Sequence, residues 1–198
     1  MANVLVEESS LQSIAAAIRM KNGTRNTYTP AQMGPAIAAI DDNGGYTKYL
    51  YYRLYITNFC RDSNTERPFQ NIARFVVVGI GGMDLANLYG ASYTASSVVS
   101  GSSAANAFDG NPETLWESDW ANVTDATGWV QVQMDKPRAA IGFVLYTRIN
   151  QRDYPLEALI QASNDGTTWT TLVTIDGTVI PQSTWYRGCN KPFILGSY

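Results

Sequence analysis

The chain has 198 residues, of which 45% are hydrophobic and 16% charged, and its formal net charge is −3. This composition is typical of a folded protein, and the absence of a positive field disfavours binding to nucleic acid. The chain contains no histidine, which excludes serine–histidine catalysis and every histidine-containing zinc site. Its two cysteines, Cys60 and Cys189, are too few for a disulfide scaffold. We expect two unpaired thiols, and the alternative is one disulfide between them.

No secretion signal or membrane span is visible. The first residues lack the basic start and apolar core of a signal peptide. The longest apolar runs, at 14–18, 36–40 and 75–80, are far too short to cross a bilayer. We therefore expect a soluble protein that does not use the ordinary export route and has no membrane partner.

Residues 1–45 are predicted to form a module of two short helices. The first covers 9–22, where Ser10 can cap it and apolar residues recur at helical spacing. The second begins at Thr29, because T-P-A-Q supplies a cap, a proline at the first helical position and a capping-box glutamine. Helices this short bury too little surface to be stable alone, so we expect them to dock onto a partner.

Residues 46–198 are predicted to form a β domain. Its strands are expected at 46–59, 72–78, 130–134, 141–148, 156–163, 169–175 and 193–195. We expect a turn at 135–138 and a hairpin around Asn164-Asp165-Gly166. In the first strand, Tyr52, Leu54 and Ile56 alternate with Arg53, Tyr55 and Thr57. Short strands at regular spacing, separated by turn signals, favour a β-sandwich.

The most distinctive stretch is A-N-A-F-D-G-N-P-E-T-L-W at 105–116, followed by G-W-V-Q-V-Q at 128–133. Together with A-L-I-Q-A-S-N-D-G-T-T-W at 158–169, it resembles the discoidin-like family: coagulation-factor C-type domains and galactose-binding carbohydrate modules. One departure is Ala158, where the family has tyrosine. The resemblance covers about residues 46–195 and implies a mainly β, jelly-roll sandwich that binds ligands with its end loops. At these strand positions we expect Trp116, Trp129 and Trp169 to lie in the core.

Two of the strands come in an unusual order. The segments Y-R-L at 52–54 and I-A-R-F at 72–75 resemble strands that come last in discoidin-like domains. Here they precede the D-G-N-P turn. We therefore predict a circular permutation, which is plausible because the ends of a compact domain often lie close together.

The N-terminal module has a resemblance of its own. L-Q-S-I-A-A-A-I-R-M-K-N-G-T at 11–24 and Y-T-P-A-Q-M-G-P-A-I at 28–37 look like a module of bacteriophage tail and baseplate proteins. The resemblance implies an attachment or oligomerisation element. We therefore expect a virion protein, made in the host cytoplasm, that forms a homo-oligomer and contacts other virion proteins through these helices.

Resemblance to the family also implies a structural calcium ion beside the D-G-N-P turn. Its ligands would be Asp109, Asn111 and Thr114, which offer the oxygen atoms that a hard cation prefers. The family's acidic ligand on the neighbouring strand is replaced by Arg74, whose guanidinium could pair with Asp109 instead. The alternative is a plain turn with an Asx hydrogen bond. We therefore expect no cofactor.

The predicted saccharide site lies in the loops, where aromatic rings and polar groups can converge. Its residues are Trp120, Asp119, Glu117, Arg148, Arg152, Tyr154, Trp185 and Arg187. Trp120 is the first choice among the aromatic residues, although loop tryptophans also serve to seal the end of a sandwich. We expect no enzyme, because the carboxylates present stand in no motif that sets an acid against a nucleophile.

These observations predict a phage virion protein that displays a carbohydrate-binding sandwich for attachment to a host-surface saccharide. The alternative is a purely structural tail, baseplate or capsid-decoration protein that makes protein–protein contacts and binds no glycan.

Overall fold

The computed structural model describes residues 8–22, 27–33, 46–60, 70–88, 90–111, 113–119, 127–147, 154–176 and 190–194. The chain divides into two compact units, Met1–Gly45 and Tyr46–Tyr198. The described residues are mainly β, and the predicted fold class is confirmed. Within these ranges, no helix has both the length and the apolar character needed to span a membrane.

The first unit contains α1 (Glu8–Asn22) and a short helical segment at 30–33. Gln32 Oε1 accepts hydrogen bonds from the backbone N–H and the hydroxyl of Thr29, at 2.9 and 3.0 Å. The bond to the Thr29 N–H is the glutamine half of the predicted capping box. Ala15 and Met33 are buried together, but Ile14 stays 39% exposed, so the described part of this unit leaves some of the apolar face of α1 uncovered.

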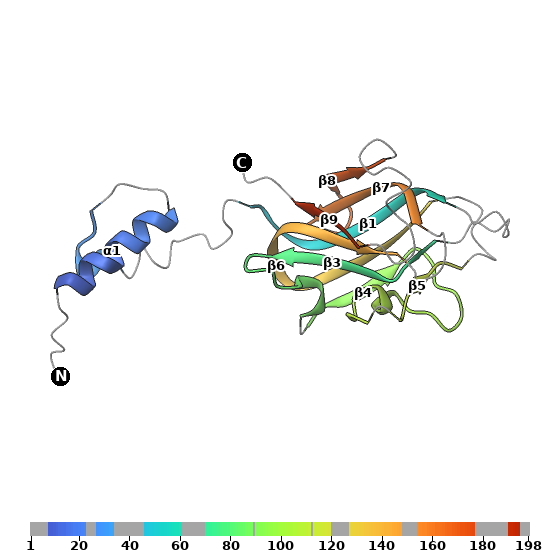
Figure 1. Cartoon of the computed structure of the whole chain (residues 1–198), viewed down its shortest axis with the longest axis horizontal. Helices are drawn as coiled ribbons and strands as arrows, with labels where there is room; N and C mark the ends of the chain where they lie inside the picture. Colours follow the sequence, from blue (N-terminus) through green and yellow to red (C-terminus); the bar gives the residue numbers. More distant parts are fainter. Residues whose placement is uncertain are drawn as a thin grey trace. The chain divides into compact units, whose positions relative to one another are not determined.

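In the described part of the second unit, seven strands form one antiparallel sheet, folded into two layers (Figure 1). The strands are β1 (Lys48–Cys60), β3 (Arg74–Gly79), β4 (Ser92–Ala95), β6 (Gly128–Tyr146), β7 (Tyr154–Ser163), β8 (Thr170–Ile175) and β9 (Asn190–Ile194). One layer has the order β4-β6-β1-β7-β8, and the other has the order β3-β6-β9.

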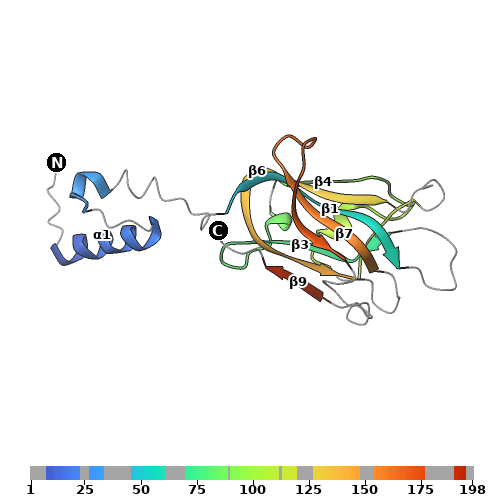
Figure 2. The ribbon, with the colours of Figure 1, turned by 90° about the horizontal axis from the view of Figure 1, so that it is seen from above.

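The long strand β6 belongs to both layers. Residues 128–133, 138 and 139 pair with β1, with a register shift across 134–137. Residues 140 and 142–146 pair with β3, and residues 142–146 also pair with β9. Figures 1 and 2 show β6 curving from one layer into the other at one end of the sandwich. The turn predicted at 135–138 is therefore wrong, because these residues continue the strand through the bend.

Side-chain contacts explain why this polar segment bends without ending the strand. The Tyr52 hydroxyl donates to the carbonyl of Arg138 at 2.7 Å and accepts from the N–H of Ala140 at 3.2 Å. Arg138 also forms an ion pair with Asp135, at 2.7 Å. A side chain from β1 thus satisfies backbone groups on both sides of the bend.

A row of aromatic rings joins the two layers through the core. Tyr52 on β1 lies 5.9 Å from Phe143 on β6, measured between ring centres, and Phe143 lies 5.8 Å from Phe75 on β3. Phe75 in turn contacts Phe108 at 5.9 Å, and Phe108 stacks on Tyr93 of β4 at 5.0 Å. Each such pair contributes about 0.5–1.5 kcal/mol beyond the area that it buries.

Shorter elements cover one side of this core: the pair β2 (Asn71–Ile72) and β5 (Trp116–Glu117), and the 3₁₀ helices Leu85–Asn87 and Ala104–Ala107. Trp116 on β5 is fully buried, as predicted. Trp129 and Trp169 are only half-buried, so their prediction as core residues is wrong. In β6 the inward positions belong to Val130 and Val132, which leaves the neighbouring Trp129 on the outward side.

Candidate ligand-binding site

The segments that carry the predicted saccharide-binding residues begin and end at one end of the sandwich. In the first layer, Ile56 pairs with Gly128 at the start of β6, and Cys60 pairs with Tyr154 at the start of β7. The end of β8 lies beside the first half of β7. The end of β1, the starts of β6 and β7, and the end of β8 therefore lie together, opposite the bend of β6 (Figure 1).

The second layer brings further strand ends to the same place. Tyr146, the last residue of β6, pairs with Arg74 at the start of β3 and with Asn190 at the start of β9. Gln70 connects the two layers here, because a Cβ atom on Gly128 would lie only 1.8 Å from its Oε1. The segments 61–69, 120–126, 148–153 and 177–189 thus connect strand ends that meet at this end.

Two predicted acidic residues lie in the described part of this end. Glu117 belongs to β5, whose partner there is Asn71, and the backbone N–H of Asp119 donates to Ser97 Oγ at 3.1 Å. Both are half-buried on either side of the fully buried Ser118, whose hydroxyl accepts from the N–H of Gln70 at 2.8 Å. The structure thus fixes the backbone of Glu117 and Asp119 beside the strand ends.

The remaining predicted residues are not placed. Trp120, Arg148, Arg152, Trp185 and Arg187 lie outside the described residues, and Tyr154 is described in its backbone only. What the structure supplies is the position of the strand ends that flank them.

The three predicted metal ligands hold one another in a compact turn. Asp109 accepts from the N–H of Asn111 at 2.8 Å through Oδ1, and from the hydroxyl of Thr114 at 2.7 Å through Oδ2. Asn111 Oδ1 accepts in turn from the N–H of Glu113, at 3.1 Å. Gly110 adopts a φ of 79°, which only glycine tolerates easily. The side-chain oxygens of Asp109 and Asn111 therefore already accept hydrogen bonds from within the turn.

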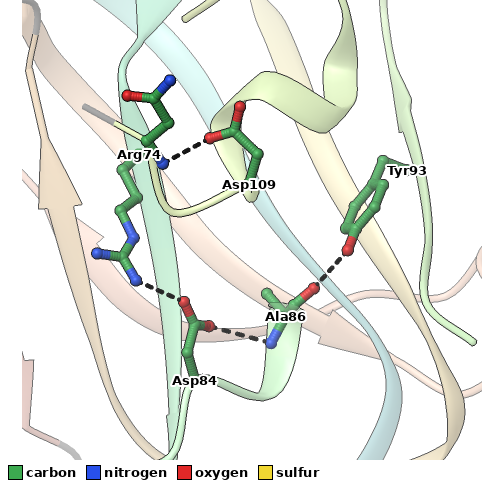
Figure 3. A network of polar contacts seen from close by, with 6 residues as sticks. Arg74, Asp84, Ala86, Tyr93 and Asp109 are labelled. Carbon is green, nitrogen blue, oxygen red and sulfur yellow. Dashed lines mark hydrogen bonds and ion pairs between the residues drawn. The ribbon is translucent and has the colours of Figure 1, made fainter. Parts of the chain in front are cut away.

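Arg74 stands beside this turn but pairs with a different carboxylate from the one predicted. Its Nη2 lies 3.0 Å from Asp84 Oδ2, and Asp84 Oδ1 accepts from the N–H of Ala86 at 3.1 Å (Figure 3). Tyr93 donates its hydroxyl hydrogen to the carbonyl of Ala86, at 2.7 Å. Burial, with Asp84 and Asp109 close by, raises the pKa of Tyr93 above its usual value. The hydroxyl therefore stays protonated as a donor.

This arrangement does not fit the calcium ion that the resemblance implies. A guanidinium lies next to the turn where a cation-binding carboxylate would be needed, and like charges repel. Nη2 of Arg74 would be 3.9 Å from a Cβ atom on Gly110. Among the residues that the structure describes, no group of three or more acidic or cysteine side chains could hold a metal ion.

Sequence reasoning missed a polar and aromatic cluster on the outward face of the first layer, centred on Arg53. The signal was present in the alternation of the first strand, which placed Arg53 and Tyr55 opposite the inward-facing Tyr52 and Leu54.

Comparison with known proteins gives one clear result. The model of the family described as F5/8 type C domain matches residues 92–193. No curated protein matches the chain. The matched region begins at β4 and ends within β9, so β1 and β3 precede it, although both pair with β6 in the same sheet.

Proposed function

The chain belongs to the F5/8 type C domain family, and from this premise we propose that its discoidin-like sandwich binds a saccharide on a bacterial surface as part of a phage particle. The observation that carries the saccharide proposal is the meeting of strand ends opposite the bend of β6. Four segments rich in aromatic and polar residues connect these ends. Binding sites form where such groups converge on a rigid scaffold.

Trp120 and Arg148 are the residues to which we assign the main contacts. Trp120 follows directly after the fixed Asp119, and Arg148 follows the buried Thr147 at the end of β6. An indole ring offers a flat apolar face to sugar C–H groups, and a guanidinium offers several donors to hydroxyl oxygens. Glu117 and Asp119 would accept hydrogen bonds from further hydroxyls.

Circular permutation of the family's sandwich is part of this proposal. β1 lies between β6 and β7, and both of those strands fall within the matched region. A sheet built from residues 92–193 alone would leave a gap one strand wide between them. We assign β1 and β3 to the strands that come last in the family's usual order, now moved ahead of β4.

Attachment to the particle is assigned to residues 1–45. The similarity of 11–24 and 28–37 to phage tail and baseplate modules supports this role, and so does the exposed Ile14 on α1. Several copies on one particle would raise a weak affinity per site through avidity. Other virion proteins and further copies of the chain would be the partners of the helices.

Glycan-array binding of the full chain, coupled at high density to beads, tests the saccharide proposal. We expect binding to a restricted set of bacterial saccharides, reduced about tenfold or more by Trp120→Ala and by Arg148→Ala. Arg138→Ala is the matched control, because Arg138 lies at the bend of β6 and is paired with Asp135. Absence of binding to any glycan or host cell would reject the proposal and leave a purely structural role in the particle.

A further inference from the structure

The outward face of β1, β7 and β8 carries a cross-strand row of polar side chains. Arg53, Gln161 and Thr171 are paired in register across the three strands. Arg53 Nε donates to Gln161 Oε1 at 2.8 Å, and Gln161 Nε2 donates to Thr171 Oγ1 at 3.1 Å. Each member of the row orients the next, so the direction of the Arg53 side chain is fixed.

Aromatic rings flank the Arg53 guanidinium on two sides. Its central carbon lies 3.8 Å from the centre of the Trp169 ring and 5.0 Å from that of Tyr55. Tyr51 meets Trp169 edge to face, at 6.4 Å and 70°. All three rings are half-buried, so each keeps part of its surface open to solvent. The ring contacts and the hydrogen bond at Nε engage the faces and one edge of the guanidinium, and neither contact uses its two Nη groups.

Arg53 differs from the other well-placed arginines in its charge environment. Arg74 and Arg138 each form an ion pair with an aspartate. Across the described ranges, Arg53 has the hydrogen bond to Gln161 and the two ring contacts, and no carboxylate pairs with it. Burial lowers the pKa of the Arg53 guanidinium below its usual value. A partly buried cation without a counter-ion gains most when an anion arrives.

The nearest turn does not supply that anion. Asp165 lies in the β7–β8 hairpin, beside Gly166, whose added Cβ would be 3.4 Å from the Tyr51 ring. Its carboxylate accepts from the N–H groups of Thr167 and Thr168 and from the hydroxyl of Ser163. The hairpin itself therefore uses this carboxylate.

We propose that this outward face, built from Tyr51, Arg53, Tyr55, Gln161, Trp169 and Thr171, is a second binding site that takes an anionic saccharide chain. The sugar rings lie against the open aromatic surfaces, and a carboxylate or phosphate on the chain accepts hydrogen bonds from the outer edge of Arg53. Bidentate recognition of such groups is the interaction that a guanidinium makes best. An extended polymer can lie along the sheet face, and the exposed Thr171 hydroxyl beside the rings suits sugar hydroxyls.

The site lies away from the strand ends that flank Trp120 and Arg148, because Arg53 lies in the middle of the paired part of β1. The two proposals therefore fail separately. Loss of neutral-glycan binding in Trp120→Ala concerns the end loops, whereas dependence on Arg53 concerns only the sheet face.

Calorimetric titration of the full chain with three length-matched probes tests this site. The probes are an oligogalacturonate, a phosphorylated oligomannan and a neutral oligogalactan. We expect binding of at least one anionic probe, weakened by added salt, and little binding of the neutral probe at this face. Arg53→Gln should weaken binding of the anionic probe about tenfold or more. Arg53→Lys should give an intermediate loss of affinity, since lysine keeps the charge but cannot form the paired hydrogen bonds of a guanidinium.

Arg138→Gln is the matched control, because it removes the same charge from an arginine that already has a partner. Equal losses in Arg53→Gln and Arg138→Gln would overturn the proposal in favour of a general charge effect. Unchanged affinity in both Arg53 variants, or no binding of either anionic probe by the folded wild-type chain, would also overturn it. Thermal melting checks folding, and Arg53→Lys decides the matter if Arg53→Gln does not fold.

Discussion

At the scale of single residues, Tyr52 joins β1 to a part of β6 that lies 86 to 88 positions further along the chain. Its ring packs between the layers, and its hydroxyl makes hydrogen bonds to Arg138 and Ala140 on either side of the bend in β6. Burial raises the pKa of this hydroxyl well above its usual value, so it remains a neutral donor at every physiological pH. The shape of β6 therefore depends on a phenol from another strand.

Replacing Tyr52 with phenylalanine should lower the free energy of unfolding by about 1–3 kcal/mol. The ring stays, but a part-buried carbonyl and a buried N–H lose their shared partner. Urea denaturation gives the value. Tyr55→Phe is the control, since that ring lies on the outward face, and it should change stability by less than about 0.5 kcal/mol. Equal effects of the two variants would contradict the role given to the hydroxyl.

Asp165 offers a prediction about pH. Hydrogen bonds from Thr168, Thr167 and Ser163 hold the pKa of this carboxyl far below the usual value for an aspartate. Because the pKa of Asp165 is lower in the folded than in the unfolded chain, its carboxylate stabilises the fold at pH values above the unfolded-state pKa. This contribution is lost as the pH falls towards and through the folded-state pKa. Asp165→Asn should therefore lower the urea midpoint at pH 7, and the gap to wild type should narrow progressively below about pH 4. A gap that stays constant from pH 7 to pH 3 would count against this explanation.

Which tryptophans lie in the core could be predicted only in part. Trp116 was placed correctly, because its motif position and its burial agree. Trp129 and Trp169 were not, because membership of a motif says that a residue matters and not which face of a strand it occupies. The inward positions beside Trp129 are taken by valines, and Trp169 is held outside by stacking with Arg53. Alternation along each strand is the better guide.

At the scale of elements, the β6 strand shows what local sequence cannot tell. Residues 135–138 carry strong turn signals, yet they fall within one continuous strand, where Arg138 is in register with Tyr49 and its carbonyl accepts from the hydroxyl of Tyr52 on β1. The capping box at Thr29 and the β7–β8 hairpin were predicted correctly, since the residues that fix them are neighbours in sequence. Long-range pairing is thus the part that the sequence left open.

The turn at 109–114 gives a prediction about metal. Asp109 uses both carboxylate oxygens within the turn, and Arg74 places a positive charge beside it. Neither millimolar calcium nor a chelator should shift the melting temperature of the full chain, because no ion stabilises the native state by mass action. Scanning calorimetry with and without calcium makes the comparison. A melting temperature that rises with calcium and saturates would show that Arg74 gives way to the ion.

At the scale of the whole molecule, the sandwich is complete only when strands from outside the matched region are included. β1 supplies the centre of one layer and β3 flanks the other, and both precede residues 92–193. The order of the motifs suggested that strands before residue 92 complete the sandwich, but neither the bend of β6 nor the two-sided pairing of β1 could be deduced from them. Whether Trp120, Arg148 and Trp185 can belong to one site depends on this topology, because it decides which segments leave from the same end of the sandwich.

Backbone NOE contacts of Leu54 in the full chain, measured by NMR on perdeuterated protein, test this topology most directly. The account predicts that Leu54 contacts Val130 of β6 on one side and Ile160 of β7 on the other, the two residues with which it is in register. Direct cross-strand contacts between Val130 and Ile160, with Leu54 elsewhere, would contradict it.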